Sequence, residues 1–114
     1  MAVILVADDE EMIRALAKAA LGSAGHEVLT AANGLEAVAL YRSFPKLIAL
    51  VITDMKMPLM DGHEVVKLVR ETRPEAKIIC MTGYSEALPP GTRILSKPFR
   101  PEELRRCVEE VLRA

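Results

Sequence analysis

The sequence predicts an α/β fold, a doubly wound five-stranded parallel sheet with a shortened or missing fourth helix. Short apolar runs alternate with amphipathic segments along the 114 residues, which is typical of parallel strands joined by crossover helices. The first, third and fourth runs are continuously apolar, as in strands that are buried on both faces. The segment 83–92 contains four helix breakers: Gly83, Pro89, Pro90 and Gly91. We therefore expect a loop or a single turn there.

Five strands and four helices are expected in this order. The strands are predicted at residues 2–7, 26–31, 47–53, 77–81 and 93–96, and the mixed polarity of the second fits an edge position. The helices are predicted at about residues 10–24, 34–44, 62–73 and 101–113. Helix ends have local signals, since Asn33 can act as an N-cap, Gly25 can end the first helix and Pro101 can begin the last.

Composition indicates one ordinary globular domain, residues 1–114, because 51% of the residues are hydrophobic and 27% are charged. The net charge is −1 and no basic cluster occurs, so we expect no nucleic-acid binding by this chain alone. No apolar stretch approaches the ~20 residues of a membrane span. Cys80 and Cys107 lie in apolar patterns and are expected to be buried packing residues of a cytoplasmic protein.

Polar side chains follow four of the predicted strands: Asp8 and Asp9, Asp54, Thr82, and Lys97. Ligands of open parallel sheets bind beyond the carboxyl ends of the strands, and connections of this length favour neighbouring strands. The carboxylates should therefore converge. Two carboxylates ~4 Å apart repel by about 4 kcal/mol at an effective dielectric of 20, so three together need a cation such as Mg²⁺.

Such a cluster suits phosphoryl chemistry. The Lys97 ammonium and a divalent cation could neutralise a phosphoryl group while one carboxylate attacks its phosphorus in line, giving an aspartyl phosphate. The Thr82 hydroxyl could bond a phosphoryl oxygen. Each residue alone has an ordinary explanation, such as a helix cap or a turn, but the set of five in this order is more specific.

Four motifs carry a resemblance to a known family: VADDEE, VITDMKMPLMDG, CMTGY and KPF. Together they resemble the receiver domain of response regulators in two-component signalling, over essentially the whole chain. The resemblance implies a flavodoxin-like fold with strand order 2-1-3-4-5. It also implies that Asp54 accepts a phosphoryl group from a histidine kinase or a histidine phosphotransfer protein.

The resemblance also implies the ligands of the metal. Asp9 would bind Mg²⁺ directly and Asp8 mostly through water, while Asp54 and the backbone carbonyl of Lys56 would complete the protein ligands. The chain would be a phosphoacceptor switch that catalyses only its own phosphorylation and dephosphorylation, not a turnover enzyme.

Further expectations follow from the family pattern near the last strand. Thr82 would move toward the phosphoryl group, Lys97 would hold it, and a cis peptide bond is implied before Pro98. Ile94 stands at the position where many receivers carry a switch aromatic. The missing fourth helix alters a surface that many receivers use for dimerisation, so we expect a monomer or a weak dimer.

Two positions bear on the lifetime of the phosphoryl group. Lys56 and Tyr84 lie two residues beyond the phosphoacceptor and the threonine, where side chains of this family influence the access of hydrolytic water. We hypothesise a fairly long-lived phosphoryl group.

The first predicted helix has a wide apolar arc, because Arg14 and Lys18 are its only polar residues between positions 12 and 21. Two interpretations remain open. One is burial of one side with alanines elsewhere, and the other is a docking surface for a partner helix at Met12, Ile13 or Leu16.

Two other function classes share this architecture. A flavin or nucleotide binder should have a first loop rich in Gly, Ser or Thr, whereas this one reads DDEE. A phosphohydrolase that uses an aspartyl phosphate usually has a second acidic residue two after the nucleophile, where Lys56 stands here. The stretch TGYSEALPPG resembles receivers of hybrid histidine kinases, so the chain is expected to be either free-standing or part of a larger protein.

Overall fold

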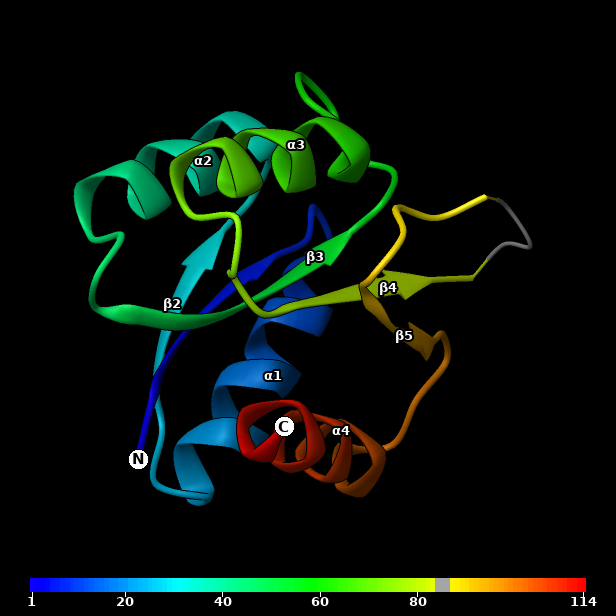
Figure 1. Ribbon diagram of the computed structural model, residues 1–114. Coiled ribbons are helices and arrows are strands. Elements are labelled where there is room, and N and C mark those ends of the chain that lie inside the picture. The colour runs from blue at the N-terminus through cyan, green and yellow to red at the C-terminus, as the bar shows by residue number, and fades with distance from the viewer. Residues whose placement is uncertain (84–86) are drawn as a thin grey trace.

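A parallel sheet lies between two layers of helices in the computed structural model, which describes residues 1–83 and 87–114 (Figure 1). The sheet order is β2-β1-β3-β4-β5, and every neighbouring pair is parallel. The strands are β1 (Val3–Ala7), β2 (Glu27–Ala31), β3 (Ile48–Asp54), β4 (Ile78–Thr82) and β5 (Arg93–Ser96). The expected strand order and the edge position of β2 are thus confirmed.

Helices cover both faces of the sheet. They are α1 (Glu11–Ser23), α2 (Gly34–Ser43), α3 (Gly62–Thr72) and α4 (Pro101–Arg113). Helices α1 and α4 lie on one face, and α2 and α3 lie on the other (Figure 1). Successive side chains of a strand point to opposite faces. In β1, for example, Ile4 and Val6 join the core under α1 and α4, whereas Leu5 and Ala7 join the core under α2 and α3.

The expected gap in the helical pattern is confirmed for the part of the chain that is described. Residues 87–92 between β4 and β5 contain no helix, although a turn occurs at residues 90–91. None of the described helices is long and apolar enough to span a membrane.

The predicted helix signals also agree with the structure. The Asn33 side chain accepts a hydrogen bond from the backbone N–H of Glu36 at 2.9 Å, so it caps α2. Gly25 follows α1 with φ +91°, a conformation that glycine adopts without a steric penalty. Pro101 is the first residue of α4. Cys80 and Cys107 are buried free thiols, as expected.

The strand register determines where the polar residues meet. Ala7 of β1 pairs with Thr53 of β3, so Asp8 and Asp54 come next at the same edge of the sheet. Thr82 of β4 pairs with Ser96 of β5, which places Lys97 just beyond the same edge. Because all five strands are parallel, one edge of the sheet receives every polar residue that follows a strand.

Candidate functional site

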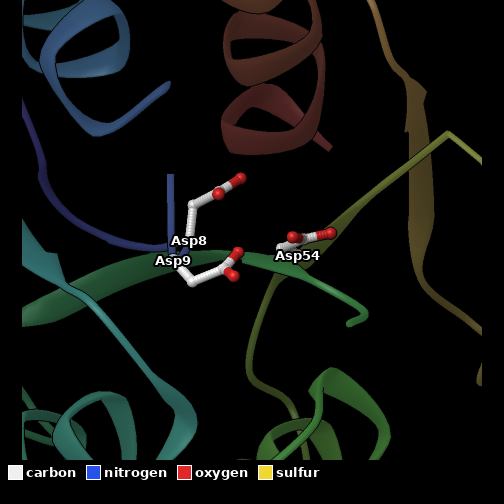
Figure 2. Close-up of side chains that lie close together, drawn as sticks. All are labelled: Asp8, Asp9 and Asp54. Atoms are coloured by element: carbon white, nitrogen blue, oxygen red, sulfur yellow. The ribbon is translucent and has the colours of Figure 1, made fainter. Parts of the chain in front are cut away.

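Three carboxylates from two neighbouring strand ends form an acidic cluster. One oxygen each of Asp8, Asp9 and Asp54 lies within 4.8 Å of the others, and Figure 2 shows the three side chains gathered at the ends of β1 and β3. Asp8 is fully buried, Asp9 is exposed, and the Asp54 side chain retains 12% of its exposure. Three negative charges at this separation repel strongly, so the cluster suits a hard divalent cation with oxygen ligands.

Both oxygens of the buried Asp8 carboxylate accept hydrogen bonds. Oδ1 accepts from the backbone N–H of Glu10 at 2.8 Å, and Oδ2 accepts from Nζ of Lys97 at 2.7 Å. The Arg14 guanidinium donates to the backbone carbonyl of Asp8 at 2.7 Å. The loop between β1 and α1 is therefore held by Arg14, a donor from α1, and by Lys97, a donor that directly follows β5.

Lys97 forms ion pairs with three carboxylates of the site. Its Nζ lies 2.7 Å from Asp8, 3.4 Å from Oδ2 of Asp54 and 3.4 Å from Oε1 of Glu10. Burial lowers the pKa of Lys97, but the hydrogen bond and charge of Asp8, followed by the charge of Asp54, raise it by more, so the net pKa is raised. The ammonium thus stays protonated at neutral pH.

Asp54 is a destabilised carboxylate. Burial, and then the negative charge of Asp8, raise the pKa of Asp54, while Lys97 and the N–H of Met55 lower it by less. The Met55 N–H donates to Oδ1 at 2.8 Å, which leaves Oδ2 on the side of Lys97. A bound cation would relieve this unfavourable charge.

A cavity of about 480 Å³ opens over the cluster. Its lining is almost entirely polar: Asp9, Glu10, Asp54, Lys56, Gly83 and Lys97. Thr82, one residue before Gly83, is buried, and its backbone carbonyl accepts a hydrogen bond from the Lys97 N–H at 2.8 Å. The cavity is thus lined by carboxylates and by two lysines, Lys56 and Lys97.

Two glycines fix the loop of residues 55–61 that follows Asp54. A Cβ on Gly62 would lie 2.3 Å from the backbone oxygen of Asp54, and a Cβ on Gly34 would lie 2.2 Å from that of Met60. The Gly62 N–H also donates to the Met55 carbonyl at 3.0 Å. Since real Cβ atoms do not approach backbone this closely, the loop keeps its place only with glycine at both positions.

Residues 4–109 match the family model of the response regulator receiver domain. The chain belongs to this family. Receiver domains are switch domains of two-component signalling systems rather than enzymes in the ordinary sense. The acidic cluster of this receiver domain lies at the carboxyl edge of the sheet, and its three carboxylates could hold a metal ion.

Curated relatives include both small and large proteins. The receiver domain is 34% identical over 117 residues to the response regulator receiver protein CpdR of Brucella abortus. The alignment covers 96% of this chain and 95% of that protein. The receiver domain is also 34% identical over 118 residues to the sensor kinase CckA of the same species, with 97% of this chain covered. The chain spans only 12% of the length of CckA, and 47% of the probable transcriptional regulator ycf27 of Porphyra purpurea.

Solved structures agree with the fold. The chemotaxis protein CheY4 of Vibrio cholerae superposes with a TM-score of 0.87 at 35% identity, covering 97% of this chain and 98% of that one. A receiver domain protein from Clostridium thermocellum superposes with a TM-score of 0.91 at 31% identity, covering 99% and 95%.

The remaining residues singled out in the sequence lie in different settings. The peptide bond between Lys97 and Pro98 is cis. Ile94 is 51% exposed on the edge strand β5. Met12 is exposed, whereas Ile13 and Leu16 are partly buried and pack against the core under α1 and α4. Tyr84 lies outside the described residues.

Sequence reasoning missed four residues that shape the receiver site. Glu10 adds a third carboxylate near Lys97, after Asp8 and Asp54, and Arg14 anchors the loop that carries Asp8. Gly34 and Gly62 make the close approaches around the loop after Asp54. Glu10 directly follows the acidic pair, which is a usable signal, but the role of a glycine at a close approach depends on which elements meet.

Proposed function

We propose that this receiver domain is a phosphorelay switch that takes a phosphoryl group from a phosphohistidine onto Asp54 in a reaction that depends on Mg²⁺. The donor would be a histidine kinase or a histidine phosphotransfer protein. The proposal rests mainly on one observation, that Asp54 shares a cluster with two further carboxylates while its Oδ2 lies 3.4 Å from the Lys97 ammonium. Family membership supports the same assignment.

The donor set fits Mg²⁺, which binds through oxygen and keeps several waters. Both oxygens of Asp8 already accept protein hydrogen bonds, so Asp8 would act mostly through water. Asp9 is exposed and lines the cavity, so it would bind directly. Asp54 and the backbone carbonyl of Lys56 would complete the protein ligands. When bound, the ion would neutralise charge on the oxygens of the phosphoryl group.

The residues of the chain would then carry the transfer. The Met55 N–H fixes one oxygen of Asp54, and Oδ2 would attack the phosphorus in line. The P–O bond to Asp54 forms as the P–N bond to the donor imidazole breaks, and the imidazole leaves as the neutral base once it holds one proton. Lys97 would exchange its contact with Asp8 for a phosphoryl oxygen, and the Thr82 hydroxyl would bond another oxygen.

The domain would act as a two-state switch that catalyses only its own phosphorylation and dephosphorylation. We take residues 1–114 as one domain that works as a monomer or a weak dimer and does not bind nucleic acid by itself. Its two buried free thiols fit a reducing compartment, which supports a cytoplasmic location.

The test of this function is to incubate the protein with acetyl phosphate, with and without Mg²⁺, and to measure intact mass. The wild type should gain one phosphoryl group only with Mg²⁺, and Asp54→Asn should gain none. Asp61→Asn is the matched control, since Asp61 caps α3 through the N–H of Glu64 and asparagine caps as well. A labelled Asp54→Asn variant, or labelling that is independent of Mg²⁺, would contradict the proposal.

Docking of the phosphodonor is proposed at the first turns of α1. Ile13→Ala should slow transfer from the cognate kinase and leave labelling by acetyl phosphate unchanged. Because Ile13 also packs against the core, an equal loss in both assays would indicate a folding defect instead.

We also propose a long-lived phosphoryl group, because the exposed Lys56 lines the cavity through which hydrolytic water must pass. Timing the loss of label tests this proposal, which is abandoned if the wild type hydrolyses as fast as Lys56→Asn.

A further inference from the structure

Leu59 has an unfavourable backbone conformation. Its φ is +72°, and it is the only residue other than glycine with a positive φ in the described ranges 1–83 and 87–114. The Met60 N–H donates to the Pro58 carbonyl at 2.8 Å, which closes a three-residue turn around Leu59. Such a γ-turn with positive φ is rare and strained, and a bulky side chain at positive φ is an outlier.

The Leu59 side chain is also unfavourably placed. It is 75% exposed, so it buries little apolar surface in the folded domain. The turn cannot relax easily, because its next residue, Met60, lies against Gly34 with no room for a Cβ. Asparagine or glycine would adopt this backbone at lower cost and would expose no apolar side chain. For the isolated domain, leucine is therefore a poor choice on two independent grounds.

Leu59 follows closely in sequence after residues that line the polar cavity. It lies five residues after Asp54 and three after Lys56, which lines the polar cavity. Met12 lies three residues after Asp9, another lining residue, and is 83% exposed. Apart from Met1, Met12 and Leu59 are the most exposed large hydrophobic residues in the described part of the chain. Each therefore follows a segment that supplies a carboxylate to the cavity.

We propose that Leu59 is a preorganised apolar contact for the protein that carries the phosphohistidine to Asp54, and that it acts together with Met12. This inference rests on the proposed function. A small phosphodonor needs to contact only the cavity. A phosphohistidine on a protein can reach Asp54 only if the protein surface around that histidine contacts the surface around the cavity. Because the Asp54 side chain is only 12% exposed, that surface must come close to the cavity, and Met12 and Leu59 stand exposed within three residues of the lining residues Asp9 and Lys56.

A second copy of this chain is a poorer occupant. A stable interface buries about 800 Å² on each partner, and two separate apolar side chains beside a charged cavity supply only a small part of that area. A transient partner needs only a few well-placed contacts, and such contacts carry most of the binding energy at interfaces.

The test compares three variants with the wild type: Leu59→Asn, Leu59→Met and Leu47→Asn. Leu47 is the matched control, since it is 58% exposed and directly precedes β3, at the opposite end of the strand from Asp54. The phosphodonors are acetyl phosphate and a panel of purified, autophosphorylated sensor kinases from the source organism. The kinase with the fastest transfer to the wild type serves as the probe.

Leu59→Asn should lower the second-order rate of transfer from this kinase by about tenfold and leave labelling by acetyl phosphate unchanged. Its thermal midpoint should rise by about 2–5 °C, because the strain of leucine in the turn is removed. Leu59→Met should keep most of the transfer rate, and Leu47→Asn should change neither the rate nor the labelling.

Three results would overturn the inference: an unchanged transfer rate in Leu59→Asn, an equal loss of labelling by acetyl phosphate, or a wild type that accepts phosphate from acetyl phosphate but from no kinase. A dimer of the wild type that Leu59→Asn dissociates would assign the contact to self-association instead. If acetyl phosphate does not label the wild type, the proposed function fails and this inference fails with it.

Discussion

The two ends of the sheet are built on opposite principles. At the amino end of the strands, cations meet carbonyl groups: Nζ of Lys77 donates to Leu112 at 3.0 Å and to Ala114 at 2.9 Å, and Arg73 donates to Pro45 at 2.8 Å. At the carboxyl end, the like charges of Asp8 and Asp54 are buried together, and Leu59 holds a strained turn.

The comparison indicates that this domain gives up stability at one end for function. Contacts at the amino end satisfy the last carbonyls of α4 and join neighbouring elements, which stabilises the fold. At the carboxyl end, the buried like charges of Asp8 and Asp54 and the strained turn at Leu59 are each unfavourable in the folded domain alone, as is common for functional sites. Substitutions that remove the buried charge or the strained turn at the carboxyl end should therefore stabilise the protein, whereas substitutions that remove contacts at the amino end should destabilise it. The predictions below run from the largest expected change in the free energy of unfolding to the smallest.

Gly62→Ala should be the most destabilising change, by about 3 kcal/mol, because its Cβ would lie 2.3 Å from the Asp54 backbone oxygen. Urea denaturation measures the difference. Gly22→Ala is the control, since nothing lies within 4 Å of a Cβ there, and it should be neutral or stabilising by up to ~1 kcal/mol. The result sharpens the comparison, because it separates tight packing at the carboxyl end from unfavourable charge. A loss below 1 kcal/mol would show that the loop after Asp54 adapts.

Lys77→Met should destabilise the protein by about 1.5 kcal/mol, since two charge-assisted hydrogen bonds to the end of α4 are lost. Labelling by acetyl phosphate should be unchanged. Lys18→Met, on the exposed side of α1, serves as the control and should change stability by less than ~0.5 kcal/mol. An equal loss of stability in Lys77→Met and Lys18→Met would contradict the comparison, because the contacts at the amino end would then stabilise the fold no more than an ordinary surface residue does.

Asp54→Asn should stabilise the protein by about 1 kcal/mol at pH 7 without Mg²⁺, although it abolishes phosphorylation. This is a fraction of the ~4 kcal/mol between unit charges 4 Å apart at an effective dielectric of 20, because Lys97 offsets most of the repulsion. Thermal denaturation measures it. A destabilised variant would mean that the pair of Asp54 with Lys97 outweighs the repulsion from Asp8.

The same variant has a defined pH dependence. Burial and Asp8 raise the pKa of Asp54 in the folded state, so the folded protein binds a proton more tightly than the unfolded chain does. The penalty in the wild type is therefore full above the raised pKa and disappears as the pH falls toward the ordinary aspartate value of about 3.9. The gap between Asp54→Asn and the wild type should close over this acidic range. A gap that widens on acidification would contradict the assignment.

Arg70→Gln should have the smallest effect, a loss of about 0.5 kcal/mol, because it removes an exposed hydrogen bond from α3 to the Pro90 carbonyl. Although this contact lies in the connection to β5, it is an ordinary surface contact. Chemical denaturation with labelling as a second readout tests it. A loss above 1.5 kcal/mol would show that the connection between β4 and β5 is held as firmly as the loop after Asp54.

Most of the fold could be predicted from local pattern. The continuous apolar runs predicted β1, β3 and β4, since strands buried on both faces need no polar side, and their observed bounds differ from the expected ones by one residue. Asn33, Gly25 and Pro101 marked helix ends because capping depends on the residues of one turn. The loop before β5 followed from its prolines and glycines.

The sequence predicted which residues form the candidate site, but it did not predict which of them contact one another. Parallel strands bring their carboxyl ends to one edge, so Asp8, Asp9 and Asp54 were expected to converge, and they do. The contact of Lys97 with Asp8 instead of Asp54 as its nearest partner was not expected. It depends on how far the end of β5 reaches over β1 and β3, which no local pattern encodes.

The sequence by itself determined the class of fold, the edge at which the polar residues collect and the family to which the chain belongs, because hydrophobic periodicity and short motifs are local properties. Tertiary structure alone decided the close approaches at Gly34 and Gly62, the strained turn at Leu59 and the shifted pKa of Asp54. These features arise where segments distant in the chain meet, since steric exclusion and Coulomb repulsion depend on distances in space and not on separation along the sequence.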